Sequence, residues 1–194
     1  MTVAIIKYNA GNVLSVMHAL RRQGIEPVLT DDAAEIASAD KVIFPGVGEA
    51  SSAMRYLRAR QLDRLIPTLR QPVLGICLGL QLMCSHSEEN DTDCMGIFSE
   101  KVRLFPPQQK VPHIGWNRVV PQKGHLFAAV PEQAFCYFVH SYFAEIGEHT
   151  TATTDYILPF SAALRKDNFH AVQFHPEKSG DTGATILGNF LKAA

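Results

Sequence analysis

Cys77 lies where a buried strand is predicted to run into an apolar helix, a position at which a cysteine can act as a nucleophile. The strand covers residues 73–76 and the helix covers residues 78–83, with Gly75 and Gly79 on either side of the cysteine. Both glycines favour a sharp turn, because a side chain at either position would collide with neighbouring backbone. The turn would place the sulfur at a helix N-terminus, where unpaired amides and the helix dipole favour a thiolate and can receive an oxyanion. We therefore predict that Cys77 is a catalytic nucleophile.

The other cysteines have no comparable setting. Free cysteines are usually buried structural residues, and we expect this of the remaining three: Cys84, Cys94 and Cys136. Cys77, Cys84 and Cys94 could instead form a metal site with His86, but separations of seven (77 to 84) and ten (84 to 94) match no Cys-x-x-Cys pattern. We expect reduced thiols and no metal site.

A histidine and a carboxylate stand two positions apart near the end of the chain, in the run His175-Pro176-Glu177. This spacing can direct both side chains to one side of an extended backbone, and the proline disfavours a helix at His175. A cysteine, a histidine and an acid form a complete set of nucleophile, base and orienting carboxylate. Cys77, His175 and Glu177 are therefore the predicted catalytic residues, and a satisfied surface histidine is the alternative for His175.

The first half of the chain alternates between short β-branched runs and helical stretches. Strands are predicted at residues 3–6, 28–30, 42–44 and 73–76, and helices at residues 12–23 and 50–60. Such alternation predicts parallel strands joined by helices. The strands are apolar without strict alternation, which is typical of a sheet covered by helices on both faces. We predict an α/β fold with a doubly wound sheet.

After about Met95, prolines separate short segments that read as antiparallel strands, including residues 114–120 and 135–139. Residues 168–174 resemble a last strand, and residues 181–191 a final helix opened by the capping-type residue Asp181. No repeat, low-complexity tract or linker divides the chain. The sequence predicts a single domain over residues 1–194.

The composition excludes several classes of protein. Of 194 residues, 46% are hydrophobic and 19% are charged, as in ordinary globular domains. Eighteen basic and nineteen acidic residues give a net charge of −1, which disfavours binding to nucleic acid or anionic lipid. The N-terminal segment lacks the pattern of a signal peptide, and no apolar run is long enough to span a bilayer. We expect a cytoplasmic protein.

The two catalytic segments together resemble the class I, or triad, glutamine amidotransferase family. The matching residues are Gly75-Ile76-Cys77-Leu78-Gly79-Leu80-Gln81 and His175-Pro176-Glu177, and Phe44-Pro45-Gly46-Val47-Gly48 matches the family's loop after the third strand. The resemblance covers the whole chain in the right order. It implies a flavodoxin-like, mostly parallel mixed sheet flanked by helices, and a glutaminase that needs no cofactor.

Four further segments are similar to those of glutaminase subunits of imidazole glycerol phosphate synthases, which act in histidine biosynthesis: Tyr8-Asn9-Ala10-Gly11-Asn12, Ser87-Glu88-Glu89, His113-Ile114-Gly115-Trp116-Asn117 and Phe138-Val139-His140-Ser141-Tyr142. The family usually has an acidic residue before the first tyrosine and a glycine after it, where this chain has Lys7 and Asn9. The resemblance implies a heterodimer with a (β/α)8-barrel synthase subunit that consumes the ammonia.

The family pattern also implies roles for individual residues. The Leu78 amide and an amide of Val47 or Gly48 would form the oxyanion hole. The residues expected to hold glutamine are Gln81, Glu89, His140, Ser141 and Tyr142. An acidic residue suits the substrate's ammonium group, whereas without the resemblance Glu89 would read as part of a solvated loop. The docking face is expected to include Gly11, Asn12, Trp116 and Lys178, although Trp116 could equally be a core aromatic residue.

Three other functions remain open at this point. A glutaminase of another biosynthetic pathway or a γ-glutamyl hydrolase would use the same three catalytic residues. A non-catalytic assembly partner would keep only the fold, and the complete set of Cys77, His175 and Glu177 argues against it.

Overall fold

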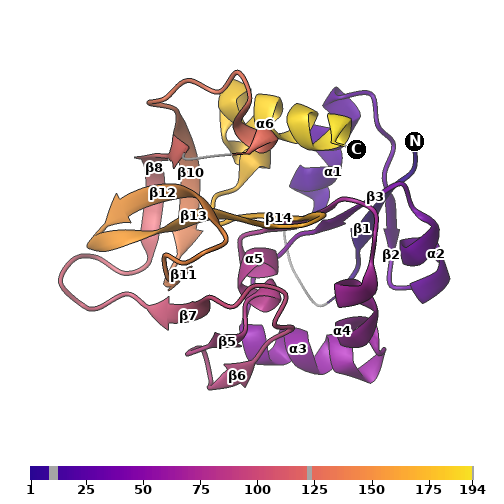
Figure 1. Ribbon diagram of the computed structural model, residues 1–194, viewed down its shortest axis with the longest axis horizontal. Coiled ribbons are helices and arrows are strands. Elements are labelled where there is room, and N and C mark those ends of the chain that lie inside the picture. Colours follow the sequence, from indigo (N-terminus) through magenta and orange to yellow (C-terminus); the bar gives the residue numbers. More distant parts are fainter. Residues whose placement is uncertain (9–12, 122–123, 194) are drawn as a thin grey trace.

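The computed structural model describes residues 1–8, 13–121 and 124–193, and its centre is a mixed β-sheet between two layers of helices (Figure 1). Five parallel strands form one half of the sheet in the order β2-β1-β3-β4-β14. Their bounds are Val3–Ile6 for β1, Val28–Thr30 for β2, Lys41–Phe44 for β3, Val73–Ile76 for β4 and Phe169–Val172 for β14. The predicted parallel strands and α/β class are confirmed.

Helices cover both faces of these strands. Figure 1 shows α1 and α6 on one face and α3, α4 and α5 on the other. Along β1, Ile5 packs in the apolar cluster that contains α1 and α6, whereas Ile6 packs in the cluster that contains α3, α4 and α5. Both faces of the strands are therefore apolar, as predicted. The helices are α1 (Val13–Arg22), α2 (Ala33–Ser38), α3 (Ala50–Ala59), α4 (Leu62–Leu65), α5 (Leu78–Met83) and α6 (Gly180–Lys192), with 3-10 turns η1 (Ile66–Thr68), η2 (His125–Phe127) and η3 (Pro176–Lys178).

The second half of the chain extends the sheet with mainly antiparallel strands, as predicted. β13 pairs with β14, β11 and β12, and the sheet continues through β7, β5 and β6. A separate two-stranded sheet is formed by β8 and β10, in which His113 lies opposite His140. The bounds are β5 (His86–Ser87), β6 (Thr92–Asp93), β7 (Lys101–Leu104), β8 (His113–Arg118), β9 (Val120–Pro121), β10 (Phe135–His140), β11 (Tyr142–Ala144), β12 (Thr150–Tyr156) and β13 (Leu158–Lys166).

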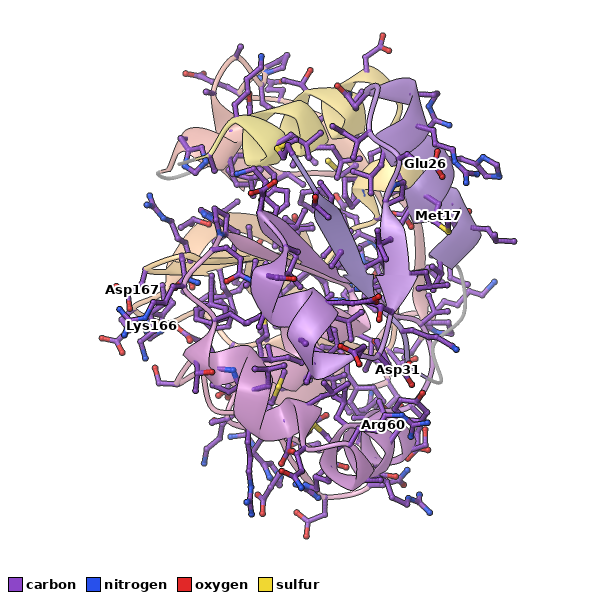
Figure 2. The ribbon with its side chains drawn as sticks, turned by 90° about the vertical axis from the view of Figure 1, so that its right-hand side faces the viewer. Met17, Glu26, Asp31, Arg60, Lys166 and Asp167 are labelled. Atoms are coloured by element: carbon purple, nitrogen blue, oxygen red, sulfur yellow. The ribbon has the colours of Figure 1, made fainter. Side chains whose placement is uncertain are left out.

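An ion pair ties α3 to the end of β2 at the edge of the sheet. Arg60 Nε lies 2.8 Å from the carboxylate of Asp31, which also accepts a hydrogen bond of 2.7 Å from the Tyr56 hydroxyl. Figure 2 labels Asp31 and Arg60 close together at this edge. These contacts hold the C-terminal part of α3 against the end of β2.

The predicted start of the last helix is wrong in one detail. Asp181 lies in the first turn of α6, and Ser179 occupies the capping position without making a side-chain capping bond. The Ser179 hydroxyl instead donates to the His175 carbonyl (2.7 Å) and accepts from the Tyr137 amide (2.9 Å). Ser179 therefore fixes the backbone beside the predicted base.

Two predicted strand boundaries also change. The expected strand 114–120 is split into β8 and β9, and the expected strand 168–174 ends as β14 at Val172. Within the described residues, no helix has the length and apolar character needed to cross a membrane.

The buried His170 predicts a dependence of stability on pH. Burial, followed by the nearby charges of His125, Arg165 and Lys41, lowers the pKa of His170 to about 4. An unfolded histidine titrates near 6.5, so the unfolded chain binds more protons than the folded chain between these values, and the free energy of unfolding falls as the pH drops from about 6.5 to about 4.

His170→Leu should reduce the slope of the unfolding free energy against pH by the contribution of about one bound proton. The slope is measured by urea unfolding at several pH values. His18→Leu is the control, because His18 is exposed on α1. Equal slopes in His170→Leu and the unsubstituted protein would contradict the assignment.

Candidate active site

The backbone at Cys77 forms the sharp turn that the flanking glycines predict. Cys77 has φ 52° and ψ −104°, a conformation that non-glycine residues rarely adopt, and its amide donates a 2.8 Å hydrogen bond to the Val172 carbonyl. A Cβ atom at Gly79 would overlap the carbonyl oxygen of Phe44, and one at Gly75 would lie 3.0 Å from the backbone of Gly79. The glycines therefore let α5 lie against β3, and this contact sets the turn.

The structure brings the three predicted catalytic residues together. His175 Nδ1 lies 2.8 Å from a carboxylate oxygen of Glu177, and both side chains are buried. Burial opposes the charged imidazole, but the electrostatic interaction with Cys77, and then the hydrogen bond and charge of Glu177, outweigh it and raise the pKa of His175 to about 10. The raised pKa means that the His175 imidazole is protonated at neutral pH.

A cavity of about 310 Å³ opens beside Cys77. All eight residues predicted to form the oxyanion hole or to hold glutamine line it, together with Cys77, Pro112 and Val139: Val47, Gly48, Leu78, Gln81, Glu89, His140, Ser141 and Tyr142. The structure therefore assembles residues that lie almost a hundred positions apart in the sequence.

The predicted oxyanion hole is closed in this conformation. The Leu78 amide donates a 3.3 Å hydrogen bond to the Gly46 carbonyl, so one of its two expected donors is occupied by the protein itself. The Tyr8 hydroxyl donates to the neighbouring Pro45 carbonyl and holds the same loop. Burial raises the pKa of Tyr8 well above its ordinary value, so this hydroxyl keeps its proton. The loop must rearrange before Leu78 can bind an oxyanion.

Glu89 lines the cavity and also caps a helix. Its carboxylate accepts a 2.7 Å hydrogen bond from the Ala50 amide and so caps α3, whose own N-terminal residue Glu49 makes no side-chain capping bond. Burial raises the pKa of Glu89, although the Ala50 amide opposes the change. A partly buried carboxylate without a strong cationic partner suits the ammonium group of an amino acid.

His140 lines the cavity, but its ring nitrogens bind the protein. Nδ1 lies 2.7 Å from the Tyr142 carbonyl, which can only accept, so Nδ1 carries the proton. Nε2 then accepts from His113 Nδ1 at 3.1 Å. Burial lowers the pKa to about 3 for His140 and about 4 for His113. Both ring nitrogens of His140 are therefore used within the fold, and its contact with glutamine stays a prediction.

Gln173 is a residue of the site that the sequence reasoning missed. Its side-chain nitrogen lies 3.6 Å from Cys77 Sγ, and its oxygen accepts from Gln81 Nε2 at 3.2 Å. The signal in the sequence was a single amide in an otherwise apolar run before His175. The predicted glutamine-binding residue Gln81 also donates to the Tyr142 carbonyl (2.9 Å), so its nitrogen serves the protein.

The expected docking residues Trp116 and Lys178 lie around an exposed apolar face of the β8–β10 sheet. Trp116 is 56% exposed, which rules out a core position, and it contacts Tyr137 edge-on with 6.0 Å between ring centres. Lys178 Nζ lies 6.0 Å from the Tyr137 ring centre. Ile114 and Phe135 extend the face and are 56% and 53% exposed. The other two expected docking residues, Gly11 and Asn12, lie outside the described residues.

Comparisons with known proteins match this chain over almost its whole length. The family described as "Glutamine amidotransferase class-I" matches residues 4–194. Two relatives carry the name "Imidazole glycerol phosphate synthase subunit HisH". The relative from Bacteroides thetaiotaomicron is 58% identical over 98% of this chain and 99% of its own length. The relative from Escherichia coli (strain K12) is 47% identical over 99% of this chain and 100% of its own length.

Solved structures share the fold at low identity. A glutamine amidotransferase has a TM-score of 0.76 at 18% identity, with 98% of this chain and 97% of that chain covered. A glutamine amidotransferase from Thermotoga maritima has a TM-score of 0.66 at 17% identity, with 98% and 82% covered. The α/β fold is therefore common to these structures and to this chain.

The contact between Gly79 and Phe44 predicts a large cost for a small substitution. In Gly79→Ala the added methyl group overlaps the Phe44 carbonyl oxygen, so α5 must move and the turn at Cys77 must distort. We expect a loss of unfolding free energy on the order of 3 kcal/mol, measured by urea unfolding, together with loss of rapid alkylation at Cys77.

Gly188→Ala is the matched control, because its Cβ atom would lie 3.6 Å from the nearest atom, an ordinary contact. It lies within α6, where alanine is favoured over glycine by up to about 1 kcal/mol. Equal stability of the two variants would refute the packing argument.

Proposed function

This chain belongs to the class-I glutamine amidotransferase family, and we propose from this premise that it is the glutaminase subunit of an imidazole glycerol phosphate synthase. Full-length relatives at 58% and 47% identity carry the name of that subunit, which favours histidine biosynthesis over another amidotransferase pathway or a γ-glutamyl hydrolase. The observation that carries the chemistry is a single cavity lined by both Cys77 and Glu89. It suits an amino acid whose ammonium group is held away from the amide that is cleaved.

The first half of the reaction forms a thioester. The thiol proton of Cys77 passes to His175 Nε2, and the thiolate attacks the side-chain amide carbon of glutamine. The carbonyl electron pair moves to oxygen and gives a tetrahedral oxyanion. When the carbon–nitrogen bond breaks, the imidazolium gives its proton to the departing nitrogen and ammonia leaves. Glu177 at 2.8 Å keeps the proton of Nδ1 in place throughout.

The second half hydrolyses the thioester. His175 Nε2, now neutral, removes a proton from water, and the hydroxide attacks the thioester carbon. Collapse of this second oxyanion breaks the carbon–sulfur bond, releases glutamate and returns the thiolate beside the imidazolium. Both oxyanions need the Leu78 amide, and loss of a single such donor costs about a hundredfold or more in rate. The isolated chain should therefore hydrolyse glutamine slowly while Leu78 donates to Gly46.

The exposed apolar face of β8 and β10 supports docking of a (β/α)8-barrel synthase subunit in a heterodimer. Val139 belongs to β10, lines the cavity and lies opposite Ile114 of the exposed face. A partner bound there would sit beside the point where ammonia forms. Ammonia that escaped into water would be protonated at neutral pH and lose its nucleophilicity, so direct transfer to the partner suits this placement.

Cys77→Ala tests the catalytic assignment. With the synthase subunit and its ligand present, glutamate release should fall about a thousandfold or more, because no other group can form the thioester. Synthesis driven by added ammonium salt should remain, because the variant still docks. Cys94→Ala is the control, since Cys94 is not among the cavity residues. Undiminished glutamine hydrolysis by Cys77→Ala would show that the nucleophile, and with it the proposed mechanism, is wrong.

Trp116→Ala tests the docking face. An exposed aromatic residue at the centre of an interface typically contributes enough that its removal weakens binding about tenfold or more. The dissociation constant for the synthase subunit is measured by titration, and stimulated glutamate release should fall in parallel at limiting partner. Leu29→Ala is the matched control, because Leu29 is 39% exposed on β2 at the opposite side of the molecule (Figure 1). Equal weakening by both variants would exclude the β8–β10 face as the docking surface.

A further inference from the structure

We propose that Gln173 is a further catalytic residue, whose side-chain amide binds the sulfur of Cys77 and stabilises its thiolate. The inference deepens the proposed function and rests on it, because it assigns another group to the same glutamine-hydrolysing site. Gln173 follows β14, where its backbone amide donates to the Ala162 carbonyl at 2.9 Å, and its side chain is fully buried. A buried amide needs partners for both of its ends.

Gln173 has those partners, and one of them is the reacting atom. Its Nε2 lies 3.6 Å from Cys77 Sγ, within hydrogen-bond range for sulfur, and its Oε1 accepts from Gln81 Nε2 at 3.2 Å. A structural glutamine would bind backbone groups, as Gln71 does by donating to the Ile36 carbonyl at 2.9 Å. The side chain of Gln173 instead directs its NH2 group at Cys77 Sγ.

The orientation of the Gln173 amide follows from a backbone carbonyl. The Tyr142 carbonyl can only accept, so the end of Gln81 that lies 2.9 Å from it must be the NH2 group. The same NH2 group faces Gln173, so the facing atom of Gln173 must be its oxygen. Its nitrogen is then left to face the sulfur. Reversing either amide would place two donors or two acceptors against each other.

A donor at this position acts on the charge of the sulfur. The Val139 carbonyl accepts from Sγ at 3.8 Å and so favours the protonated thiol. The first amide of α5, at Leu78, donates to Gly46. Hydrogen bonds to a charged acceptor are about twice as strong as bonds between neutral groups, so the Gln173 amide favours the thiolate over the thiol. It would also favour the thiolate when the carbon–sulfur bond of the second tetrahedral intermediate breaks.

Among the described residues, His175, from the segment after β14, and Tyr8, from the end of β1, interact with the charge of the sulfur. Three further titratable residues line the same cavity as Cys77: Glu89, His140 and Tyr142. Glu177 acts through its bond to His175. Gln173 cannot ionise, so its contribution can be separated from theirs by a pH profile. Substituting Gln173 should move the profile of Cys77 while these groups stay in place.

The test is the pH dependence of Cys77 alkylation by iodoacetamide in the full chain, followed by mass spectrometry of the Cys77 peptide. Gln173→Met removes the donor at similar volume, and Gln173→Glu keeps an acceptor for Gln81 but places a carboxylate beside the sulfur. We expect the midpoint of the profile to rise by about one pH unit in Gln173→Met, and further in Gln173→Glu. Gln71→Met is the matched control, and the Cys136 peptide is the internal reference.

The outcomes separate this inference from the proposed function. Alkylation requires neither glutamine nor a partner, so a shifted midpoint supports the role of Gln173 even where glutamate release is absent and the proposed function fails. A midpoint within about 0.3 units of the unsubstituted protein in Gln173→Glu, with thermal unfolding still cooperative, overturns the inference. If Gln173→Met does not fold, Gln173→Glu alone decides the result. With the synthase subunit present, Gln173→Met should lower kcat for glutamine about tenfold.

Discussion

The close approach of Gly79 to the carbonyl of Phe44 is the contact on which the site depends. It lets α5 begin against β3, and the chain can then leave β4 only through the turn at Cys77, with φ 52° and ψ −104°. Because β4 lies between β3 and β14, that turn presents the sulfur to the loop after β3 on one side and to residues 173–177 on the other. The packing of α5 against these buried strands thus maintains the strained backbone conformation at Cys77.

A second organising contact is the Tyr142 carbonyl, which accepts hydrogen bonds from both His140 and Gln81. One chain of bonds runs from it through His140 to His113, and the other runs through Gln81 and Gln173 to Cys77. Both histidines are neutral at physiological pH, because burial lowers their pKa values to about 4 or below. The network therefore fixes side-chain orientations without adding charge beside the thiolate and imidazolium.

The sequence was sufficient to predict the features that depend on local patterns. Apolar runs specified the parallel strands, paired glycines specified the turn at Cys77, and the spacing in His175-Pro176-Glu177 specified the contact between His175 and Glu177. The hydrogen bond from the Leu78 amide to the Gly46 carbonyl could not be predicted, because it depends on the orientation of one peptide group at Gly46.

The hydrogen-bond partners of individual polar side chains also could not be predicted from the sequence. The histidine at 140 suggested a substrate contact, but its partners are set by the register of β8 against β10. Ser179 and Gln173 carry roles that depend on contacts across the sheet, which residue type does not reveal.

The closed loop after β3 limits glutamine hydrolysis at a small cost in free energy. The contacts that hold it are the bonds from Leu78 to Gly46 and from Tyr8 to Pro45, and each such bond contributes about 1 kcal/mol net. A missing oxyanion donor raises the barrier by about 3 kcal/mol or more. A preference of about 2 kcal/mol for the closed loop leaves it open in about one chain in thirty, so it would slow glutamine hydrolysis about thirtyfold while Cys77, His175 and the cavity stay assembled. Because docking of a partner can supply more free energy than these two bonds hold, ammonia would be released mainly when a synthase is bound to use it.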